Sequence, residues 1–398
     1  MYQMLRLKNT WSAPRAVEFT QKLCQVKSVS CQESALADLV EHQMNMIGFD
    51  RVVRDSAGNV VGLILGRTGN PTVLLNSHMD TVDATGTGWR HQPLSGRISG
   101  GRLYGLGSSD CKSGLSAQLF VAELLKHSLL PLEGNLVVAA TVAEENGMGS
   151  GVQTLIEQTL PELSIKPDYA ILGEPTDMGL YYGHDGWIEM DITIEGSNPF
   201  QVDDAAEAVY EEMQADEGVS TLRPRFEQTQ GRRRAVLQVS RRMAMQDDAT
   251  TTVNQLRHEA TRVAQSVGTL AVEVGICQET RQLYSGKTTV VRRATHAWMT
   301  DPFHPLIERS RQSLTAAGCN VRPGKWQLGK FGMGTAGGIL VNQYKIPTIG
   351  YGPGEEAQAH AEDESVAVDS IGECVYGTAA IVHSLIGTPV FGWTTDEI

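Results

Sequence analysis

The chain has 398 residues, 41% of them hydrophobic and 20% charged, which is the composition of a globular protein and excludes a disordered or fibrous chain. Its 33 basic and 46 acidic residues give a formal net charge of −13, which argues against nucleic acid or an anionic membrane as a general partner. A chain of this length is typical of two or three domains.

No segment of the sequence has the pattern of a targeting or membrane-spanning signal. Residues 1–14 lack an apolar stretch of signal-peptide length, and the apolar run 136–143 is too short to cross a bilayer. The six cysteines lie far apart without a C-x-x-C pair, so neither a disulfide framework nor a zinc knuckle is expected. These observations predict a protein of the reducing cytoplasm.

Strand-like and helix-like segments alternate over the first 180 residues. The predicted helices are 16–26, 33–48 and 113–127, and the predicted strands are 59–65, 72–76, 135–142 and 169–172. Segment 135–142 (NLVVAATV) is almost continuously apolar, as expected for a strand covered on both faces. This alternation predicts a layered α/β domain with a largely parallel sheet.

The pattern changes near residue 187. Segment 187–195 (WIEMDITIE) alternates between apolar and polar residues, which predicts a strand with one solvated face. It is followed by a predicted helix at 203–213, a strand at 234–240, a helix at 251–266, a strand at 270–276 and a further strand within 292–298. The α/β pattern then returns, with predicted helices at 305–317, 335–343 and 369–386 and a strand at 347–351. We therefore divide the chain into a discontinuous domain, 1–183 and 296–398, and an inserted α+β domain, 184–295.

Five short segments concentrate side chains that bind metal ions. They are 75–82 (LNSHMDTV), 106–114 (LGSSDCKSG), 142–147 (VAEENG), 172–176 (LGEPT) and 359–364 (AHAEDE). Ligands of an open α/β sheet bind beyond the carboxyl ends of its strands, and three of these segments follow a predicted strand. Two imidazoles with several carboxylates favour zinc, cobalt or manganese, whereas carboxylates alone would favour magnesium or calcium.

Each of these residues also has an ordinary structural interpretation. His78 suits a buried core histidine, Asp110 suits the N-cap of the next helix, and Glu174 suits the start of a turn. The pair Glu144-Glu145 and His360 suit solvated loops. No two residues have the helical H-E-x-x-H spacing, so spacing alone does not identify a metal site.

The order of the five segments and their amino-acid sequences resemble those of the M20 family of zinc metallopeptidases. This family includes acetylornithine deacetylase, succinyl-diaminopimelate desuccinylase and glutamate carboxypeptidase. The resemblance covers nearly the whole chain and is strongest over 72–176 and 328–371. The family motifs H-x-D-x-V, G-x-x-D-x-K/G, E-E, G-E-P-T and G-P-G with A-H-x-x-D/N-E correspond to His78–Val82, Gly107–Lys112, Glu144–Glu145, Gly173–Thr176, and Gly352–Gly354 with Ala359–Glu364.

The resemblance implies a zinc-peptidase-like α/β/α catalytic domain and an inserted α+β, ferredoxin-like domain that acts as lid and dimerisation surface. It implies two divalent ions per chain, Zn²⁺ first and Mn²⁺ or Co²⁺ as alternatives. The implied metal ligands are His78, Asp110, Glu145, Glu174 and His360, with Asp110 shared between the ions. Asp80 would hold the His78 imidazole and fix its tautomer. Glu144 would bind no metal and would act as the general base and acid.

Cys111 and two glycine-rich segments are interpreted as structural features near the implied site. The resemblance implies a cis peptide bond between Asp110 and Cys111, and we interpret Cys111 itself as a packing residue. The glycine-rich segments 332–338 and 350–354 lack a phosphate-loop pattern. We interpret them as turns that let the backbone approach a neighbouring segment closely.

The substrate-facing motifs depart from the family pattern. The lid motif G-x-x-x-H is represented by Gly196–Phe200 (GSNPF), the D-x-R motif by Ser240–Arg242, and the T-D-A motif lies within Gly334–Gly338. The lid histidine is therefore missing, and His184, His296 and His304 are alternative sources of oxyanion support. For each of these three histidines a structural or surface position is the favoured interpretation, and a substrate that needs no such histidine is the other alternative.

Arginine side chains collect in the inserted domain, where a solvated surface balanced by acidic residues is the alternative to a binding patch. Because arginine binds carboxylates through paired hydrogen bonds, we predict substrate contacts at Arg242, Arg292 and Arg293. We also predict a substrate contact at His184.

The leading functional prediction is a two-metal hydrolase of a C–N amide bond in a small carboxylate-bearing substrate, such as an N-acyl amino acid or a short peptide. One alternative keeps the metal site for another hydrolytic C–N cleavage, such as deamination of an aromatic amino acid. An alternative of a different class is a catalytically silent binding or scaffold relative. We expect a homodimer or larger homo-oligomer formed through the inserted domain, with neither nucleic acid nor membrane as a partner.

Overall fold

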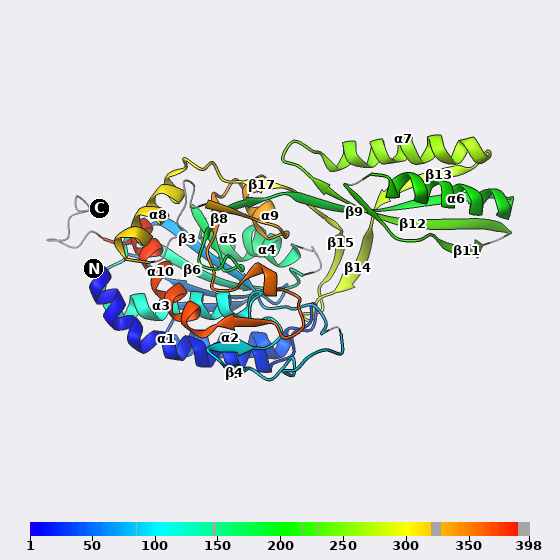
Figure 1. Cartoon of the computed structure of the whole chain (residues 1–398). Helices are drawn as coiled ribbons and strands as arrows, with labels where there is room; N and C mark the ends of the chain where they lie inside the picture. Colours follow the sequence, from blue (N-terminus) through cyan, green and yellow to red (C-terminus); the bar gives the residue numbers. More distant parts are fainter. Residues whose placement is uncertain (85, 146–148, 217, 230, 320–327, 389–398) are drawn as a thin grey trace. The chain divides into compact units, whose positions relative to one another are not determined.

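The computed structural model describes residues 1–84, 86–145, 149–216, 218–229, 231–319 and 328–388. The chain divides into two compact units (Figure 1). Unit 1 comprises Met1–Gly183, Arg281–Thr289 and the residues from Met299 onward, and unit 2 comprises His184–Thr280 and Val290–Trp298.

The unit boundaries differ from the predicted domain boundaries on the carboxyl-terminal side of the insert. The chain returns to unit 1 after Trp298 rather than at 295/296, and segment 281–289, expected in the insert, belongs to unit 1. The reason is a tertiary contact, because the Tyr284 hydroxyl donates to the Gly58 carbonyl oxygen at 2.5 Å. No local pattern in the sequence indicates this contact.

The main sheet of unit 1 has the strand order β1-β2-β6-β3-β7-β19-β8-β17, with β18 beside β8. The strands are β1 (Arg51–Arg54), β2 (Val60–Ile64), β3 (Gly69–His78), β6 (Gly134–Thr141), β7 (Tyr169–Leu172), β8 (Leu180–His184), β17 (Trp298–Met299), β18 (Leu328–Phe331) and β19 (Thr348–Gly350). Strands β6, β3, β7 and β19 are parallel, whereas β1, β2 and β8 pair antiparallel. The prediction of a largely parallel sheet therefore holds only for its centre.

Helices cover both faces of this sheet and confirm the predicted α/β/α layering. In the sheet, β6 and β7 lie on opposite sides of β3, so the connection from β3 to β6 and the connection from β6 to β7 run in opposite directions. Because both crossovers are expected to be right-handed, their helices lie on opposite faces of the sheet. The first crossover is α3 (Lys112–Ser128), which packs on β3 together with α10 (Val368–Ile386), and α1 (Tyr2–Gln25) packs against both helices.

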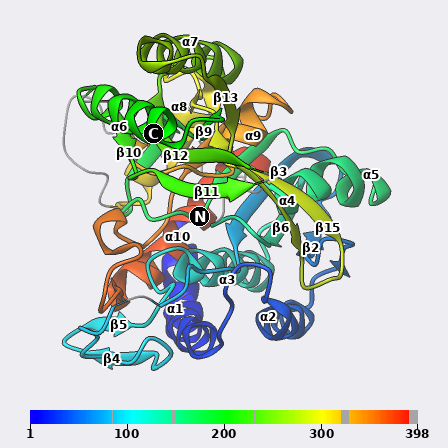
Figure 2. The ribbon, with the colours of Figure 1, turned by 90° about the vertical axis from the view of Figure 1, so that its right-hand side faces the viewer.

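The other helices of unit 1 complete the two layers. They are α2 (Ser34–Ile47), α4 (Ser150–Thr154), α5 (Leu160–Glu162), α8 (Pro305–Ala316) and α9 (Gly337–Asn342). In Figures 1 and 2, α1, α2 and α3 lie on one side of the sheet and α4, α5 and α9 on the other. In the part of the chain that is described, no helix is both long enough and apolar enough to span a membrane.

A small sheet of unit 1 has the order β20-β5-β4, formed by β20 (Ser365–Ala367), β5 (Arg102–Tyr104) and β4 (Arg97–Ser99). Ser365 of β20 pairs with Tyr104 of β5. This pairing brings segment 359–364, which precedes β20, beside segment 106–114, which follows β5. These three-residue strands have no detectable periodicity and were not predicted.

Unit 2 has the split β-α-β arrangement of a ferredoxin-like domain. Its elements are β9 (Gly186–Gly196), α6 (Pro199–Gln214), β10 (Val219–Thr221), β11 (Arg225–Thr229), β12 (Arg232–Met243), α7 (Ala249–Val267), β13 (Ala271–Ile276) and β16 (Ala294–Thr295). The antiparallel path is β10-β12-β9-β13. Ile188, Met190, Ile192 and Ile194 of β9 are buried with apolar residues of α6 and α7, which confirms the predicted one-sided strand. Strands β14 (Gln278–Gln282) and β15 (Thr288–Arg292) pair separately.

Candidate metal centre

The five motif segments converge at one edge of the main sheet of unit 1. His78 is the last residue of β3, Glu144-Glu145 follow β6, and Glu174 follows β7. Because these strands are parallel neighbours, their carboxyl ends meet at the same edge. Asp110 immediately precedes Cys111, the N-cap of α3, and His360 arrives through the pairing of β20 with β5.

The potential ligand atoms form two groups that share Asp110. His78, Asp110, Cys111 and Glu174 form one group and Asp110, Glu145 and His360 form the other, with the ligand atoms of each group within 4.8 Å of one another.

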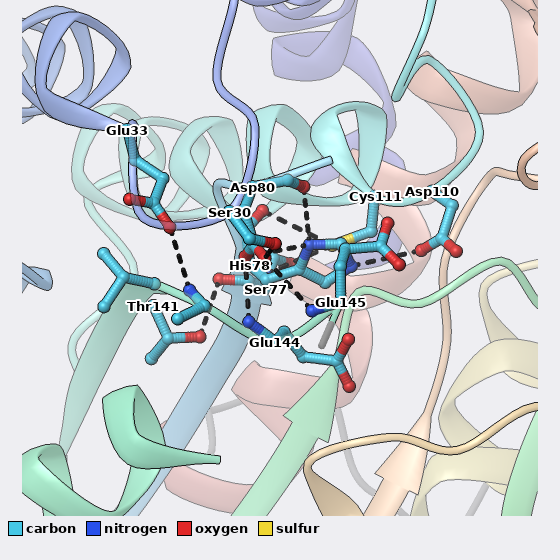
Figure 3. Close-up of polar contacts among 12 residues, drawn as sticks. Ser30, Glu33, Ser77, His78, Asp80, Asp110, Cys111, Thr141, Glu144 and Glu145 are labelled. Atoms are coloured by element: carbon cyan, nitrogen blue, oxygen red, sulfur yellow. Dashed lines mark hydrogen bonds and ion pairs between the residues drawn. The ribbon is translucent and has the colours of Figure 1, made fainter. Parts of the chain in front are cut away.

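The two carboxylate oxygens of Asp110 face different histidines. Oδ1 lies 3.2 Å from His78 Nε2, and Oδ2 lies 3.4 Å from His360 Nε2. His78 Nε2 is also 3.8 Å from Glu174 Oε2, and His360 Nε2 is 2.9 Å from Glu145 Oε2. Figure 3 shows His78, Asp110 and Glu145 converging. A carboxylate with one oxygen toward each group has the geometry of a bridge between two ions.

The site holds more carboxylates than imidazoles, and this excess of negative groups tests whether the residues fit a metal pair. Four carboxylates (Asp110, Glu144, Glu145 and Glu174) surround the imidazoles of His78 and His360. Desolvation, together with the charge of Asp110, raises the pKa of Glu145 and raises that of Glu174 well above its ordinary value. Desolvation, and then Glu145, Asp80 and Asp110, raise the pKa of Glu144 to about 8, although His78 opposes the shift. Within the described chain, Glu145 Oε1 is buried without a hydrogen-bond partner. Divalent cations supply the positive charge and the coordination that these groups lack, so the donor set fits.

Asp80 contacts the His78 imidazole through both its main chain and its side chain. His78 Nδ1 lies 2.9 Å from the main-chain oxygen of Asp80 but 3.6 Å from its carboxylate. The carboxylate also accepts the backbone N–H groups of Glu144 and Glu145, both at 3.0 Å, and the Ser30 hydroxyl at 2.5 Å. Both contacts are on Nδ1, so His78 Nε2 faces the other ligand atoms.

Glu364 holds the loop that presents Asp110. Its Oε1 accepts the N–H groups of Ser109 at 2.8 Å and Asp110 at 3.0 Å, and its Oε2 accepts that of Gly107 at 2.8 Å. Glu364 lies four residues after His360 in the sequence. A single buried carboxylate therefore ties together the segments that carry two of the predicted ligands.

Replacing Glu364 by Ala is expected to lower the free energy of unfolding by about 3 kcal/mol or more, because each buried donor left unpaired costs about 1–3 kcal/mol. Glu362→Ala is the matched control, because Glu362 is exposed and its Oε1 accepts the single N–H of Gly88 at 2.9 Å. Urea denaturation measures both variants. Equal losses in the two variants would contradict this role of Glu364.

Cys111 and the G-P-G segment pack closely against the segments that carry the ligands. The peptide bond Asp110–Cys111 is cis, and Cys111 Sγ accepts the His78 N–H at 3.2 Å. Desolvation raises the pKa of this thiol, which keeps it neutral. A Cβ at Gly352 would lie 2.2 Å from the Glu174 carbonyl oxygen, and one at Gly354 would lie 2.1 Å from the Ser109 carbonyl oxygen. Glycine therefore allows this backbone to pack directly on the segments that carry Glu174 and Asp110.

The predicted substrate contacts all lie in unit 2. His184 is buried, with Nδ1 2.8 Å from the Asp185 main-chain oxygen and its ring edge-on to Trp298. Arg293 forms ion pairs with Glu189 and Glu279, each at 3.2 Å. These contacts favour structural roles for His184 and Arg293.

Of the remaining candidates, one has a structural contact and three are exposed. His304 caps α8 by accepting the Leu306 N–H at 3.1 Å, which is a structural role. Arg242, Arg292 and His296 are exposed, and substrate contact by them stays a prediction.

Two buried residues that the sequence analysis missed contact the turn after β6. Glu33 Oε1 accepts the Ala143 N–H, and Asn59 Oδ1 accepts the Val142 N–H, both at 3.0 Å. The residues that these bonds join are separated by 110 and 83 positions in the sequence. No short-range pattern marks such contacts.

The α/β/α fold with a cluster of histidine and carboxylate ligands at its sheet edge is that of a metal-dependent hydrolase. The chain belongs to peptidase family M20/M25/M40, whose model matches residues 74–384. This result confirms the resemblance found in the motifs.

The chain is also similar to individual proteins and solved structures. The chain is 25% identical to the Escherichia coli (strain K12) protein YgeY over 395 residues, which cover 93% of this chain and 94% of YgeY. It is 30% identical over 203 residues to succinyl-diaminopimelate desuccinylase 2 of Ruegeria sp. (strain TM1040), covering 47% and 51% of the two chains. The crystal structure of Bacillus subtilis YXEP, a dinuclear metal-binding peptidase of the M20 family, matches with a TM-score of 0.70 at 13% identity, covering 94% of this chain and 98% of YXEP.

Proposed function

We propose that the protein hydrolyses an amide C–N bond in a small carboxylate-bearing substrate, an N-acyl amino acid or a short peptide, with the help of two divalent metal ions. The observation that carries this proposal is the position of Asp110, whose two oxygens face two separate groups of ligand atoms. The similarity to a desuccinylase and to a dinuclear metal-binding peptidase supports the amide bond as the target.

Each ion would have its own ligands in addition to the shared Asp110. His78 and Glu174 would hold one ion, and Glu145 and His360 would hold the other. Mixed imidazole and carboxylate ligands suit Zn²⁺, with Mn²⁺ or Co²⁺ as alternatives. When bound, such a pair lowers the pKa of water and stabilises the negative charge that develops on the substrate carbonyl oxygen.

Glu144 belongs to neither ligand group and is the residue that would move the proton. Its carboxylate would accept a proton from the attacking water and then donate it to the leaving nitrogen, which requires both protonation states to be accessible. Burial raises the pKa of Glu144 to about 8, which supports access to the protonated form. Asp80 Oδ1, which accepts the Glu144 N–H, fixes the backbone from which the side chain acts.

A substrate panel tests the reaction class. Acetyl, succinyl and formyl amino acids and dipeptides are incubated with protein loaded with Zn²⁺, Mn²⁺ or Co²⁺, and release of a primary amine is measured. We expect turnover of at least one acyl amino acid or dipeptide. Ammonia release from an aromatic amino acid, without any amide hydrolysis, would favour the deaminase alternative. Absence of both reactions, together with less than one metal ion per chain, would favour the binding or scaffold alternative.

Removing the metal is expected to abolish activity and lower stability. Ions that bind only the folded state at a concentration of 100 times their Kd raise the free energy of unfolding by about 2.7 kcal/mol. Chelator-treated protein should regain both activity and stability with Zn²⁺, Mn²⁺ or Co²⁺. Mg²⁺ is the control, because it prefers octahedral oxygen ligands and should restore less. Chelated protein that keeps full activity would contradict the metal-dependent mechanism.

We also infer that the protein forms a homodimer through unit 2. Strand β13 lies at the edge of the described sheet of unit 2, and an edge strand offers backbone groups to a second copy. Light scattering should give twice the chain mass of 43.2 kDa. A monomeric mass at micromolar concentration would contradict this inference.

A further inference from the structure

Four consecutive backbone N–H groups after β6 donate to side-chain oxygens from other parts of the chain. Those of Glu144 and Glu145 donate to the two oxygens of Asp80, as described above. The Ala143 N–H donates to Glu33 Oε1 and the Val142 N–H donates to Asn59 Oδ1, both at 3.0 Å. Figure 3 shows Glu33 and Asp80 reaching this turn, which carries Glu144 and Glu145.

The conformation of the turn explains why it needs external support. Ala143 has a φ of 57°, in the left-handed region that residues other than glycine rarely adopt. Ala143 is fully buried, so its N–H cannot exchange its partner for water. Without the Glu33 oxygen, this donor would be unpaired inside the protein, and the turn would relax toward a conformation that pairs it.

Glu33 and Asn59 are themselves held in place and fully buried. Glu33 Oε1 also accepts the Cys31 N–H at 3.0 Å. The Asn59 amide nitrogen donates to the Gly151 carbonyl oxygen at 2.8 Å and to Asp55 Oδ2 at 2.7 Å. These donor contacts orient the Asn59 amide so that Oδ1 faces the Val142 N–H.

We propose that Glu33 and Asn59 are positioning residues for the turn 142–145 and thereby set the placement of Glu144 and Glu145. Neither residue belongs to the two groups of ligand atoms, so both act through the backbone. The inference rests on the proposed function, in which Glu144 moves the proton and Glu145 binds an ion. A turn held at four successive N–H groups keeps both side chains in working geometry without reorganisation during the reaction.

Three substitutions at Glu33 test the proposal. Glu33→Ala removes the acceptor, Glu33→Asp withdraws it by the length of one methylene, and Glu33→Gln keeps an oxygen at the same reach. Because changes to residues that support metal ligands cost about 10–100-fold in activity or metal affinity, we expect the Ala and Asp variants to lose about that much in kcat. KM should change far less than kcat, and the Gln variant should keep most of the activity.

Calorimetric titration with Zn²⁺ provides a readout independent of turnover. The Ala and Asp variants should bind one of the two ions about 10–100-fold more weakly, because Glu145 is displaced. The Asp variant keeps the proposal testable if Glu33→Ala does not fold. Glu123→Ala is the matched control, because Glu123 is a buried glutamate of α3 whose Oε2 accepts the hydroxyl of Ser12 in α1. The control should lose stability but keep kcat and both ion affinities.

The outcomes separate this inference from the proposed function. Ala and Asp variants with kcat and both ion affinities within about twofold of the original protein, or a Gln variant as impaired as Ala, would overturn the positioning role. A fully active Glu144→Ala variant would instead overturn the proposed mechanism. The titration would still report the placement of Glu145 in that case, because it requires no turnover.

Discussion

Replacing Glu144 by Ala is expected to remove almost all turnover while both metal ions stay bound. The residue lies outside the two groups of ligand atoms, and we propose that its carboxylate moves the proton. General acid–base catalysis contributes about 10²–10⁴-fold, so kcat should fall by that factor. Steady-state kinetics on the best substrate of the panel and elemental analysis of the purified variant measure the two effects.

Two further variants make this test specific. Glu144→Gln keeps the size of the side chain and should be as inactive as the Ala variant, because an amide neither accepts nor returns a proton at neutral pH. Glu162→Gln makes the same chemical change at an exposed position of α5 and should leave kcat unchanged. An active Glu144→Ala variant, or one that purifies without metal, would show that Glu144 has a different role.

Replacing Asp110 by Asn is expected to remove both ions, whereas Glu174→Gln should remove only one. The reason is that Asp110 contributes an oxygen to each group, whereas Glu174 belongs to one group. Losing the ions removes about 4 kcal/mol or more of charge stabilisation in the transition state, which corresponds to about a 10³-fold fall in kcat. The number of bound ions per chain is the decisive quantity.

Titration of both variants with Zn²⁺ or Mn²⁺ measures that number. The original protein should bind two ions per chain, Glu174→Gln one tight ion, and Asp110→Asn none with comparable affinity. Asp110→Asn that still binds two ions would refute the shared-carboxylate geometry. Equal ion counts in the two variants would instead place Asp110 in a single site.

Long elements with a clear periodicity were predictable from the sequence. Strand β6 was expected because a continuously apolar run suits a strand buried on both faces, and all eight of its residues are buried. Strand β9 was expected because its residues alternate, and alternate residues are buried in the core of unit 2. Both patterns are local, so recognising them does not require knowledge of contacts with distant segments.

Short or irregular elements were not predictable. Helix α1 begins at Tyr2 rather than at residue 16, because it continues through Pro14, which usually interrupts a helix. Strands β4, β5 and β20 are three residues long and have no measurable period. Segment 281–289 belongs to unit 1 because of contacts such as that of Tyr284 with Gly58, which no periodicity encodes.

For the metal centre, the sequence by itself determined which residue types are present and that His78, Glu145 and Glu174 follow strands, because a strand and its end are local features. Only the tertiary structure decided that Asp110 faces two groups, that the Asp80 carboxylate also holds the turn after β6, and that Glu33 and Asn59 contact that turn. These are distances of about 3 Å between segments far apart in the chain, and hydrogen bonding depends on such distances rather than on any sequence spacing.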